Sequence, residues 1–208
     1  MRRTNDFYET AAWQVDALVD NLPELSGYIW CPCVGDGSLM RRLRERRIDL
    51  CGFITNDIDE SKRAEFHVDA TTADGWNTML RSGFQCDWVV ENFPFNVESR
   101  ILPYALQAAR CGVVAMVRVS FCEPTKDRGP WLAEHPYDKR ITLERHSFTG
   151  NGRTDSATTD WLVWAKVPIR GPFGISAYGY RSGQASRGSS LLVAVDPSAE
   201  VLESGPRA

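Results

Sequence analysis

Short apolar runs alternate with segments of helical spacing over residues 11–120. The apolar runs, which fit buried strands, are "GYIWC" (27–31), "LCGFIT" (50–55), "DWVV" (87–90) and "GVVAMVRVS" (112–120). The segments that fit helices are 11–22, 38–47, 75–83 and 97–111. We expect Pro103 to start or kink the last of these helices. Strands that alternate with helices in this way predict a parallel α/β sheet with helices on both faces.

The pattern changes after residue 120. Two further strand-like runs, 140–148 and 159–167, are separated by the polar stretch "TGNGRTDSAT", which predicts an antiparallel hairpin at the edge of the sheet. From Gly171 onward the chain is rich in Gly and Ser and has little periodicity. We therefore predict one folded domain over residues 1–170 and a loop or flexible tail over residues 171–208.

The composition fits a protein of a reducing compartment. Its 208 residues include 24 Lys and Arg against 27 Asp and Glu, a formal net charge of −3, and six cysteines without a CxxC pair. No signal peptide is recognisable, and the most apolar run is short and carries Arg118, so we expect a cytoplasmic protein without a membrane partner. The histidines and cysteines show no zinc-site spacing, so we expect no metal. The choice between monomer and dimer stays open.

The stretch "WCPCVGDGSL" (30–39) places Gly35-Asp36-Gly37 between a predicted strand and a predicted helix. Glycines at such a turn permit positive φ and let a ligand approach the backbone, next to the unpaired N–H groups that begin the helix. Residue 40 is Met, so the stretch is not the G-x-G-x-x-G of dinucleotide sites. An ordinary tight turn is the alternative.

Two aspartates follow in the same region of the predicted sheet. Asp57 lies 22 residues after Gly35, a spacing typical of an acid that accepts ribose hydroxyls in doubly wound folds. Asp69 stands where a further strand would end, and there its carboxylate would accept the exocyclic amine of a bound adenine. A helix N-cap is the alternative role for both aspartates, although the spacing favours the ribose role for Asp57.

The loop "ENFPFN" (91–96) exposes an amide, a proline and aromatic rings directly after an apolar strand. The carbonyl of Asn92 accepts from an amine, Pro94 fixes the backbone so that a nearby carbonyl accepts a second bond, and Phe95 offers a face for stacking. These groups fit a planar heterocycle that carries an NH₂ group. Two acceptors that hold such an amine out of the ring plane would localise its lone pair for attack on an electrophile.

Together these stretches resemble the S-adenosylmethionine-dependent amino-methyltransferases, whose catalytic loop reads (D/N/S)-(P/I/L)-P-(Y/F). "NFPF" (92–95) matches this pattern and departs from it at Phe93. "CPCVGDGSL" (31–39) is similar to the family's cofactor turn E-P-x-x-G-x-G, with Cys31 in place of the acidic residue. "FYETAAW" (7–13) resembles the N-terminal segment Y-x-T-P, and the second half of the chain looks like the small adenine methyltransferases of phages and prophages. The resemblance covers roughly residues 5–168.

The resemblance implies a Rossmann-like methyltransferase fold, with a mostly parallel seven-stranded sheet and one antiparallel strand. It implies S-adenosylmethionine as cofactor and the N6 of an adenine flipped out of duplex DNA as the methylated atom. The catalytic residues that it implies are Asn92, Phe93, Pro94 and Phe95. The cofactor-binding residues that it implies are Tyr8, Thr10, Cys31, Pro32, Gly35, Asp36, Gly37, Asp57, Ile58, Asp69, Ala70 and Asn92.

We expect base selection from loops 121–140 and 147–158. The candidate DNA-binding residues are Lys126, Arg128, Thr149, Arg153, Thr154 and Ser156. Residues 118–187 hold 11 basic and 7 acidic side chains, which favours contact with a phosphate backbone, although a solvated face gives the same imbalance.

Other functions stay open at this point. RNA adenine, cytosine N4 and protein glutamine also present a planar NH₂ group. The Cys31 substitution allows an inactive cofactor-binding module, and the missing third glycine speaks against a nicotinamide oxidoreductase.

Overall fold

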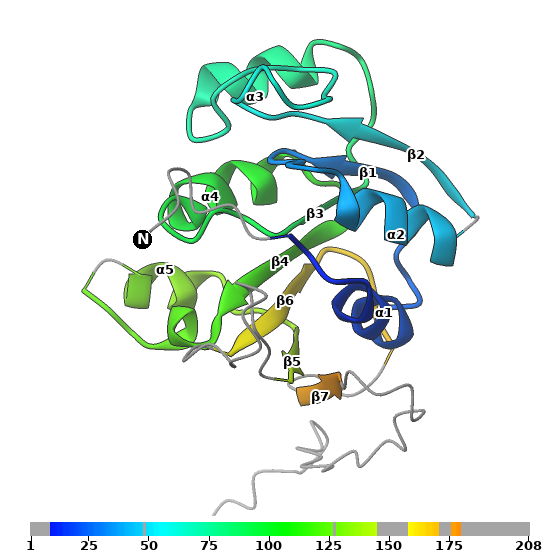
Figure 1. Ribbon diagram of the computed structural model, residues 1–208. Coiled ribbons are helices and arrows are strands. Elements are labelled where there is room, and N and C mark those ends of the chain that lie inside the picture. The colour runs from blue at the N-terminus through cyan, green and yellow to red at the C-terminus, as the bar shows by residue number, and fades with distance from the viewer. Residues whose placement is uncertain (1–8, 48, 127, 145–157, 171–175, 180–208) are drawn as a thin grey trace, which may run out of the picture.

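The computed structural model describes residues 9–47, 49–126, 128–144, 158–170 and 176–179, shown in colour in Figure 1. Among these residues the α-helices are α1 (Ala12–Asn21), α2 (Ser38–Arg46), α3 (Ala73–Leu80), α4 (Glu98–Ala108) and α5 (Arg128–Glu134). A short 3-10 helix, Val119–Cys122, joins β4 to the loop before α5. The strands are β1 (Gly27–Cys31), β2 (Leu50–Thr55), β3 (Trp88–Glu91), β4 (Gly112–Arg118), β5 (Lys139–Leu143), β6 (Thr159–Ala165) and β7 (Ser176–Gly179).

The strands form one sheet in the order β2-β1-β3-β4-β6-β5-β7. Strand β6 runs antiparallel to both of its neighbours, β4 and β5. The other neighbouring pairs, from β2 across to β4 and between β5 and β7, are parallel. The prediction of a mostly parallel seven-stranded sheet with one antiparallel strand is therefore confirmed.

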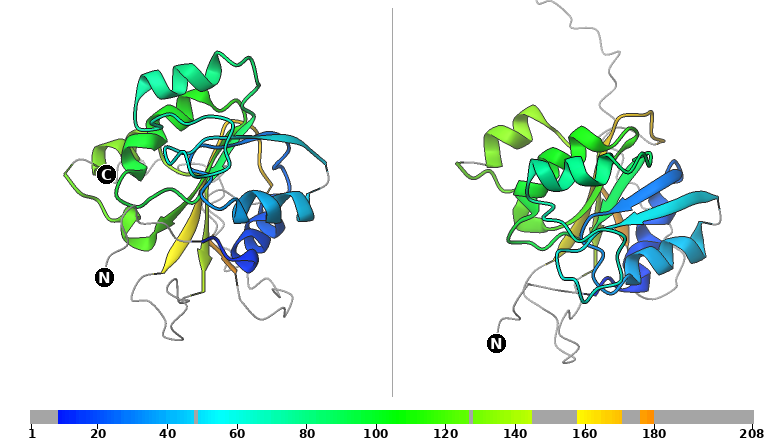
Figure 2. Two further views of the ribbon diagram at one scale, coloured as in Figure 1. Left: turned by 45° about the horizontal axis from the view of Figure 1, so that its top comes forward. Right: turned by 90° about the horizontal axis from the view of Figure 1, so that it is seen from above.

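Apolar side chains cover both faces of this sheet, as a parallel sheet buried between helices requires. Successive strand residues point to opposite faces, so Ile29 packs in one cluster with Leu18 of α1 and Leu43 of α2. Its neighbour Trp30 packs in the other cluster, with Trp76 of α3. Figures 1 and 2 show the same division, with α1 and α2 on one side of the sheet and α3 and α4 on the other.

Local signals explain where several helices begin. Thr72 is the N-cap of α3, and its side-chain oxygen accepts the N–H of Gly75. At α1 the Gln14 side chain accepts the N–H of Ala11 at 2.9 Å. Pro103 lies inside α4, which begins at Glu98, so of the two effects expected of this proline the start of the helix is excluded.

Four further expectations need correction. The predicted hairpin, β5 with β6, is antiparallel as expected, but β7 lies beyond β5 and takes the sheet edge. Strand β7 also falls within the segment 171–208 that the sequence predicts as loop or tail; the residues on either side of it lie outside the described part of the chain. The segment before Asp69, expected to be a strand, makes a single isolated bridge between Asn56 and Phe66. The loop expected at 121–140 contains helix α5.

Candidate active site

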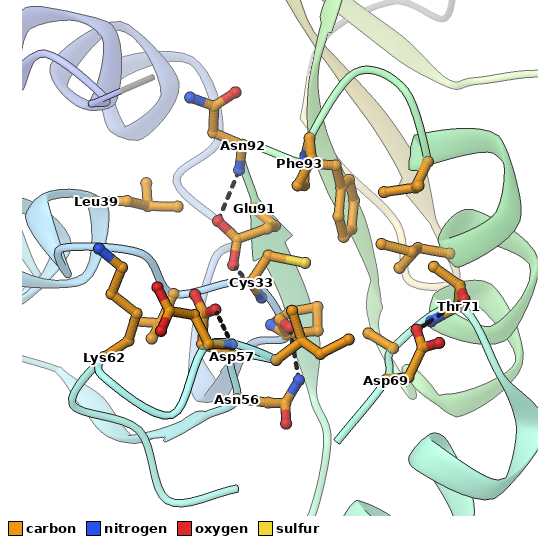
Figure 3. Close-up of a pocket in the computed structure, with 18 of the residues that line it drawn as sticks. Cys33, Leu39, Asn56, Asp57, Lys62, Asp69, Thr71, Glu91, Asn92 and Phe93 are labelled. Carbon is orange, nitrogen blue, oxygen red and sulfur yellow. Dashed lines mark hydrogen bonds between the residues drawn. The ribbon is translucent and has the colours of Figure 1, made fainter. Parts of the chain in front are cut away.

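The loops that follow β1, β2 and β3 surround one cavity of about 430 Å³ at the carboxyl edge of the sheet (Figure 3). The first residues of α4 and Thr10, just before α1, complete its wall. Open α/β sheets bind their ligands at this edge, where neighbouring loops separate. The fold therefore brings the glycine turn, the two aspartates and the "ENFPFN" loop to one place.

The glycine turn after β1 has the backbone that its residues predict. Gly35 and Gly37 have φ values of 58° and 74°, in the left-handed region that glycine adopts most readily. Asp36 and Pro32 line the cavity, and the Asp36 side chain accepts the N–H of Ser38 at 3.0 Å. Cys31 is different, because its side chain is 1% exposed and packs in the core beneath α1 and α2.

Asp57 connects the loops after β1 and β2. Its Oδ2 accepts the N–H of Gly35 at 2.9 Å, and its Oδ1 accepts the N–H of Asp59, also at 2.9 Å. Asp57 is half-buried and lines the cavity, as does the next residue, Ile58, whose side chain is 66% exposed. Asp57 caps no described helix, so the carboxylate is positioned at the cavity wall by two backbone N–H groups.

Buried Asn56 holds the same two loops together and was not predicted from the sequence. Its Nδ2 donates to the carbonyls of Pro32 at 2.8 Å and Val68 at 3.1 Å. Its Oδ1 accepts the N–H of Val68 at 2.9 Å. An amide satisfied on both sides in this way fixes the wall against which a ligand would rest.

Asp69 lies on the opposite side of the cavity (Figure 3), and the next residue, Ala70, also lines it. Asp69 Oδ1 accepts both the N–H and the hydroxyl of Thr71, at 2.8 and 2.7 Å, and these bonds lower the pKa of the carboxyl. The N-cap of the following helix is Thr72, so Asp69 does not fill that alternative role. Arg100 of α4 donates to the Thr71 hydroxyl at 2.9 Å and closes this side.

The loop after β3 places Asn92, Phe93 and Pro94 on the cavity wall. The Asn92 amide donates from Nδ2 to the Thr10 hydroxyl at 3.2 Å. The Pro94 carbonyl accepts the N–H groups of Val97 and Glu98, at 3.0 and 3.1 Å, so it is engaged with the start of α4. Phe93 is 1% exposed and belongs to the core cluster beneath α3 and α4.

Phe95 stands apart from the cavity wall. Its ring is half-buried, and the guanidinium of Arg118, at the end of β4, lies 4.6 Å from the ring centroid. A cation at this distance over an aromatic face is attracted to it. The fold therefore pairs Phe95 with a positive charge that the sequence did not associate with it.

Glu91 is the functional candidate that sequence reasoning missed. It ends β3, is 3% exposed and lines the cavity. Its Oε2 accepts the N–H of Cys33 at 3.0 Å, and its Oε1 accepts the N–H of Asn92 at 2.9 Å. Burial raises the pKa of Glu91 to about 8, with a further contribution from Asp57. The sequence did contain a signal for this role, because the first residue of "ENFPFN" is a glutamate that directly follows a predicted buried strand.

The candidate DNA-binding residues are placed only in part. Lys126 is exposed, whereas Arg128 donates from Nη2 to the carbonyls of Ser120 at 2.8 Å and Glu123 at 3.0 Å. Arg128 also lies over the ring of Phe121. Thr149, Arg153, Thr154 and Ser156, like Tyr8 of the cofactor set, lie outside the described residues.

Two classes of site are not found in the part of the chain that the structure covers. No group of three or more His, Cys, Asp or Glu side chains there is arranged to hold a metal ion. No helix among these residues combines the length and the apolar character needed to cross a bilayer.

Comparisons with known proteins identify the fold. No protein-family model matches the chain, and no curated protein matches its sequence. A class I S-adenosylmethionine-dependent methyltransferase from Listeria monocytogenes is similar, with a TM-score of 0.56 and 13% identity over 85% of this chain and 66% of that one. The type I restriction-modification methyltransferase subunit from Streptococcus thermophilus has a TM-score of 0.60 at 13% identity, over 80% of this chain and 46% of that one.

A third similar structure is the M protein of the type I restriction enzyme EcoKI, with a TM-score of 0.55 and 13% identity over 77% of this chain and 44% of that one. The chain thus spans less than half the length of both restriction-modification proteins. At these identities the likeness establishes architecture. The chain has the Rossmann-like fold of class I S-adenosylmethionine-dependent methyltransferases.

Proposed function

We propose that the chain binds S-adenosylmethionine in this cavity and methylates the exocyclic N6 of adenine in DNA. The observation that carries the proposal is the position of Asn92, on the wall of the same cavity that Asp57 and the glycine turn enclose. The similar structures include methyltransferase subunits of type I restriction-modification systems, which supports DNA as the partner.

The polar groups of the cavity fit the cofactor. The carboxylates of Asp36, Asp57, Asp59, Asp69 and Glu91 line it, and the proposed ligand carries ribose hydroxyls, an adenine amine and an ammonium group as donors. Asp57 would accept from the ribose, and Asp69, with Ala70 beside it, would face the adenine. A cavity of about 430 Å³ lies within the range of small-molecule sites, roughly 300–1,000 Å³. When bound, the cofactor supplies an electrophilic methyl group.

The chain's own residues would prepare the target amine. The Asn92 side-chain carbonyl would accept one N–H of the amine, and a backbone carbonyl of the loop would accept the other. Because the Pro94 carbonyl is bonded to the start of α4, the second acceptor is a different carbonyl of this loop. The hydrogen bond from Asn92 Nδ2 to Thr10 orients the amide so that its oxygen faces away from Thr10.

Engagement of the base would involve Phe95 and the segments 121–140 and 147–158. Stacking on an aromatic ring contributes about 1–3 kcal/mol per base, similar to the few kcal/mol that extrusion of a base from a duplex costs. We propose that Lys126 contacts phosphate, together with Thr149, Arg153, Thr154 and Ser156 of the second segment. The Arg128 side chain would serve mainly to hold the loop that carries Lys126, because it already binds two backbone carbonyls.

A labelling experiment tests this function. Purified protein is incubated with methyl-labelled S-adenosylmethionine and either duplex DNA or RNA, and the nucleosides are separated after digestion. We expect label on N6-methyl-2′-deoxyadenosine from DNA, and none with the Asn92→Ala variant. Label confined to RNA, cytosine or the protein itself would replace DNA adenine as the substrate.

A further inference from the structure

At the end of the cavity next to Asn92, the wall includes the carboxylate of Glu91, a residue of strand β3. In the family that this sequence resembles, the acidic residue of the cofactor turn stands at position 31, which is Cys here. The Cys31 side chain is 1% exposed, packs in the core and does not line the cavity. Glu91 does line it, from the neighbouring strand β3 (Figure 3).

The hydrogen bonds of Glu91 show that the fold holds this carboxylate in place. One oxygen accepts the N–H of Cys33 on the glycine turn, and the other accepts the N–H of Asn92 on the catalytic loop. A carboxylate has about four lone-pair directions, so two backbone donors leave room for further donors. A buried carboxyl with two donors and an open cavity in front of it is suited to bind a cation that donates hydrogen bonds.

The neighbouring residues indicate which part of a ligand would lie there. Asp57 and Glu91 lie close to each other on one side of the cavity, with Glu91 next to Asn92, and Asp69 lies on the other side (Figure 3). If the adenine lies at Asp69 and the ribose at Asp57, an extended ligand reaches Glu91 with its amino-acid end. That end carries an ammonium group, which donates hydrogen bonds, whereas a sulfonium does not.

We propose that Glu91 binds the α-ammonium of the cofactor's methionine moiety and so supplies, from β3, the carboxylate that the glycine turn lacks at Cys31. This inference rests on the proposed use of S-adenosylmethionine. In this proposal Glu91 binds the cofactor, and its side chain takes no part in the methyl transfer itself.

Proton linkage distinguishes this role from a purely structural one. Burial raises the pKa of Glu91 to about 8, and Asp57 faces it as a second negative group, with the thiols of Cys31 and Cys33 nearby. An ammonium that arrives next to Glu91 lowers this pKa again, so binding below pH 8 expels the proton. The affinity for an ammonium-bearing ligand therefore rises between pH 6 and pH 8 because of Glu91.

Three ligands and two variants separate the possibilities. S-adenosylmethionine and S-adenosylhomocysteine both carry the ammonium, whereas 5′-methylthioadenosine keeps the nucleoside and lacks the amino-acid end. Glu91→Gln removes the charge with little change of volume. The matched control is Glu98→Gln, because Glu98 is also buried, also has its pKa raised to about 8, and does not line the cavity.

Titration calorimetry of the ligand-free protein at pH 7 gives the readout. Glu91→Gln should weaken both ammonium-bearing ligands by about 10- to 100-fold, the range expected for loss of a charged hydrogen-bond acceptor, and leave 5′-methylthioadenosine unchanged. Glu98→Gln should bind all three ligands as the wild type does. Unchanged affinity of Glu91→Gln for S-adenosylhomocysteine, or a loss confined to S-adenosylmethionine, would overturn the ammonium assignment.

The wild type also provides a measurement that needs no variant. Repeating the titrations in two buffers of different ionisation enthalpy should show release of about one proton with S-adenosylhomocysteine and none with 5′-methylthioadenosine. Equal proton release with both ligands would overturn the inference even if Glu91→Gln failed to fold. Failure of all three ligands to bind the wild type would instead refute the proposed cofactor.

Discussion

Glu98 provides a test of how burial controls stability next to the candidate active site. It is the first residue of α4 and is 7% exposed, and its Oε2 has no hydrogen-bond partner among the described residues. Burial raises the pKa of its carboxyl from 4.5 to about 8, although Arg128 and Arg118 act in the opposite direction. We predict that Glu98→Gln stabilises the protein at neutral and alkaline pH.

The magnitude follows from linkage. The folded protein binds this proton more tightly than the unfolded chain does, so the contribution of Glu98 is fully present below pH 4.5 and is lost as the pH rises through about 8. At about 1.4 kcal/mol per pH unit, the loss approaches roughly 3 kcal/mol at pH 7 and 5 kcal/mol above pH 8. Glutamine stays neutral throughout, so the variant avoids this loss.

Urea denaturation at pH 5, 7 and 9 measures the difference in the free energy of unfolding between wild type and Glu98→Gln. The two proteins should differ by less than about 1 kcal/mol at pH 5, and the advantage of the variant should grow to several kcal/mol at pH 9. The titration of Glu91 affects both proteins equally, so it does not contribute to the difference between their free energies of unfolding. Glu60→Gln, at an exposed position, is the control and should change stability by less than about 0.5 kcal/mol. A difference between wild type and Glu98→Gln that did not grow with pH would refute the assignment of burial as the cause.

Three further predictions concern the site and the sheet beside it. Asp57→Ala should weaken S-adenosylhomocysteine binding by about 10- to 100-fold and lower the unfolding free energy by about 1–2 kcal/mol, because Asp57 also holds two backbone N–H groups; calorimetry and urea denaturation measure these effects. Asn92→Ala should abolish methyl transfer and retain cofactor binding, and Phe95→Ala should weaken DNA engagement more than Phe95→Tyr, in labelling and DNA-binding assays. Arg140→Met should cost about 3–5 kcal/mol in thermal or urea unfolding, because it leaves fully buried Asp160 without the ion pair at 2.7 Å, and adding Asp160→Asn should restore most of the loss.

Local patterns in the sequence predicted most of the secondary structure. The strands of the first half are runs of apolar residues, buried on both faces in β3 and β4, and each helix places its apolar residues on one face, so the period alone identifies them. The predicted strands 27–31 and 50–55 coincide with β1 and β2. Helix α5 was missed because it is only seven residues long and includes Gly129 and Pro130, residue types that are typical of loops.

These local patterns could not predict which strands pair with one another in the sheet. A hairpin of β5 and β6 was predictable from two adjacent runs, but the insertion of β6 between β4 and β5 depends on which neighbour its backbone bonds to. The same limit applies to β7, which lies in a segment rich in Gly and Ser and pairs with β5, more than 30 residues earlier in the chain.

The sequence by itself determined the alternating strands and helices, the glycine turn and the amide-bearing loop, because each depends on residues close together in the chain. Only the tertiary structure decided what these stretches do together. The hydrogen bonds that join Gly35 to Asp57, Cys33 to Glu91 and Asn92 to Thr10 span 22, 58 and 82 residues. Such contacts depend on strand order and on the depth at which each side chain is buried, and these are properties of the assembled sheet.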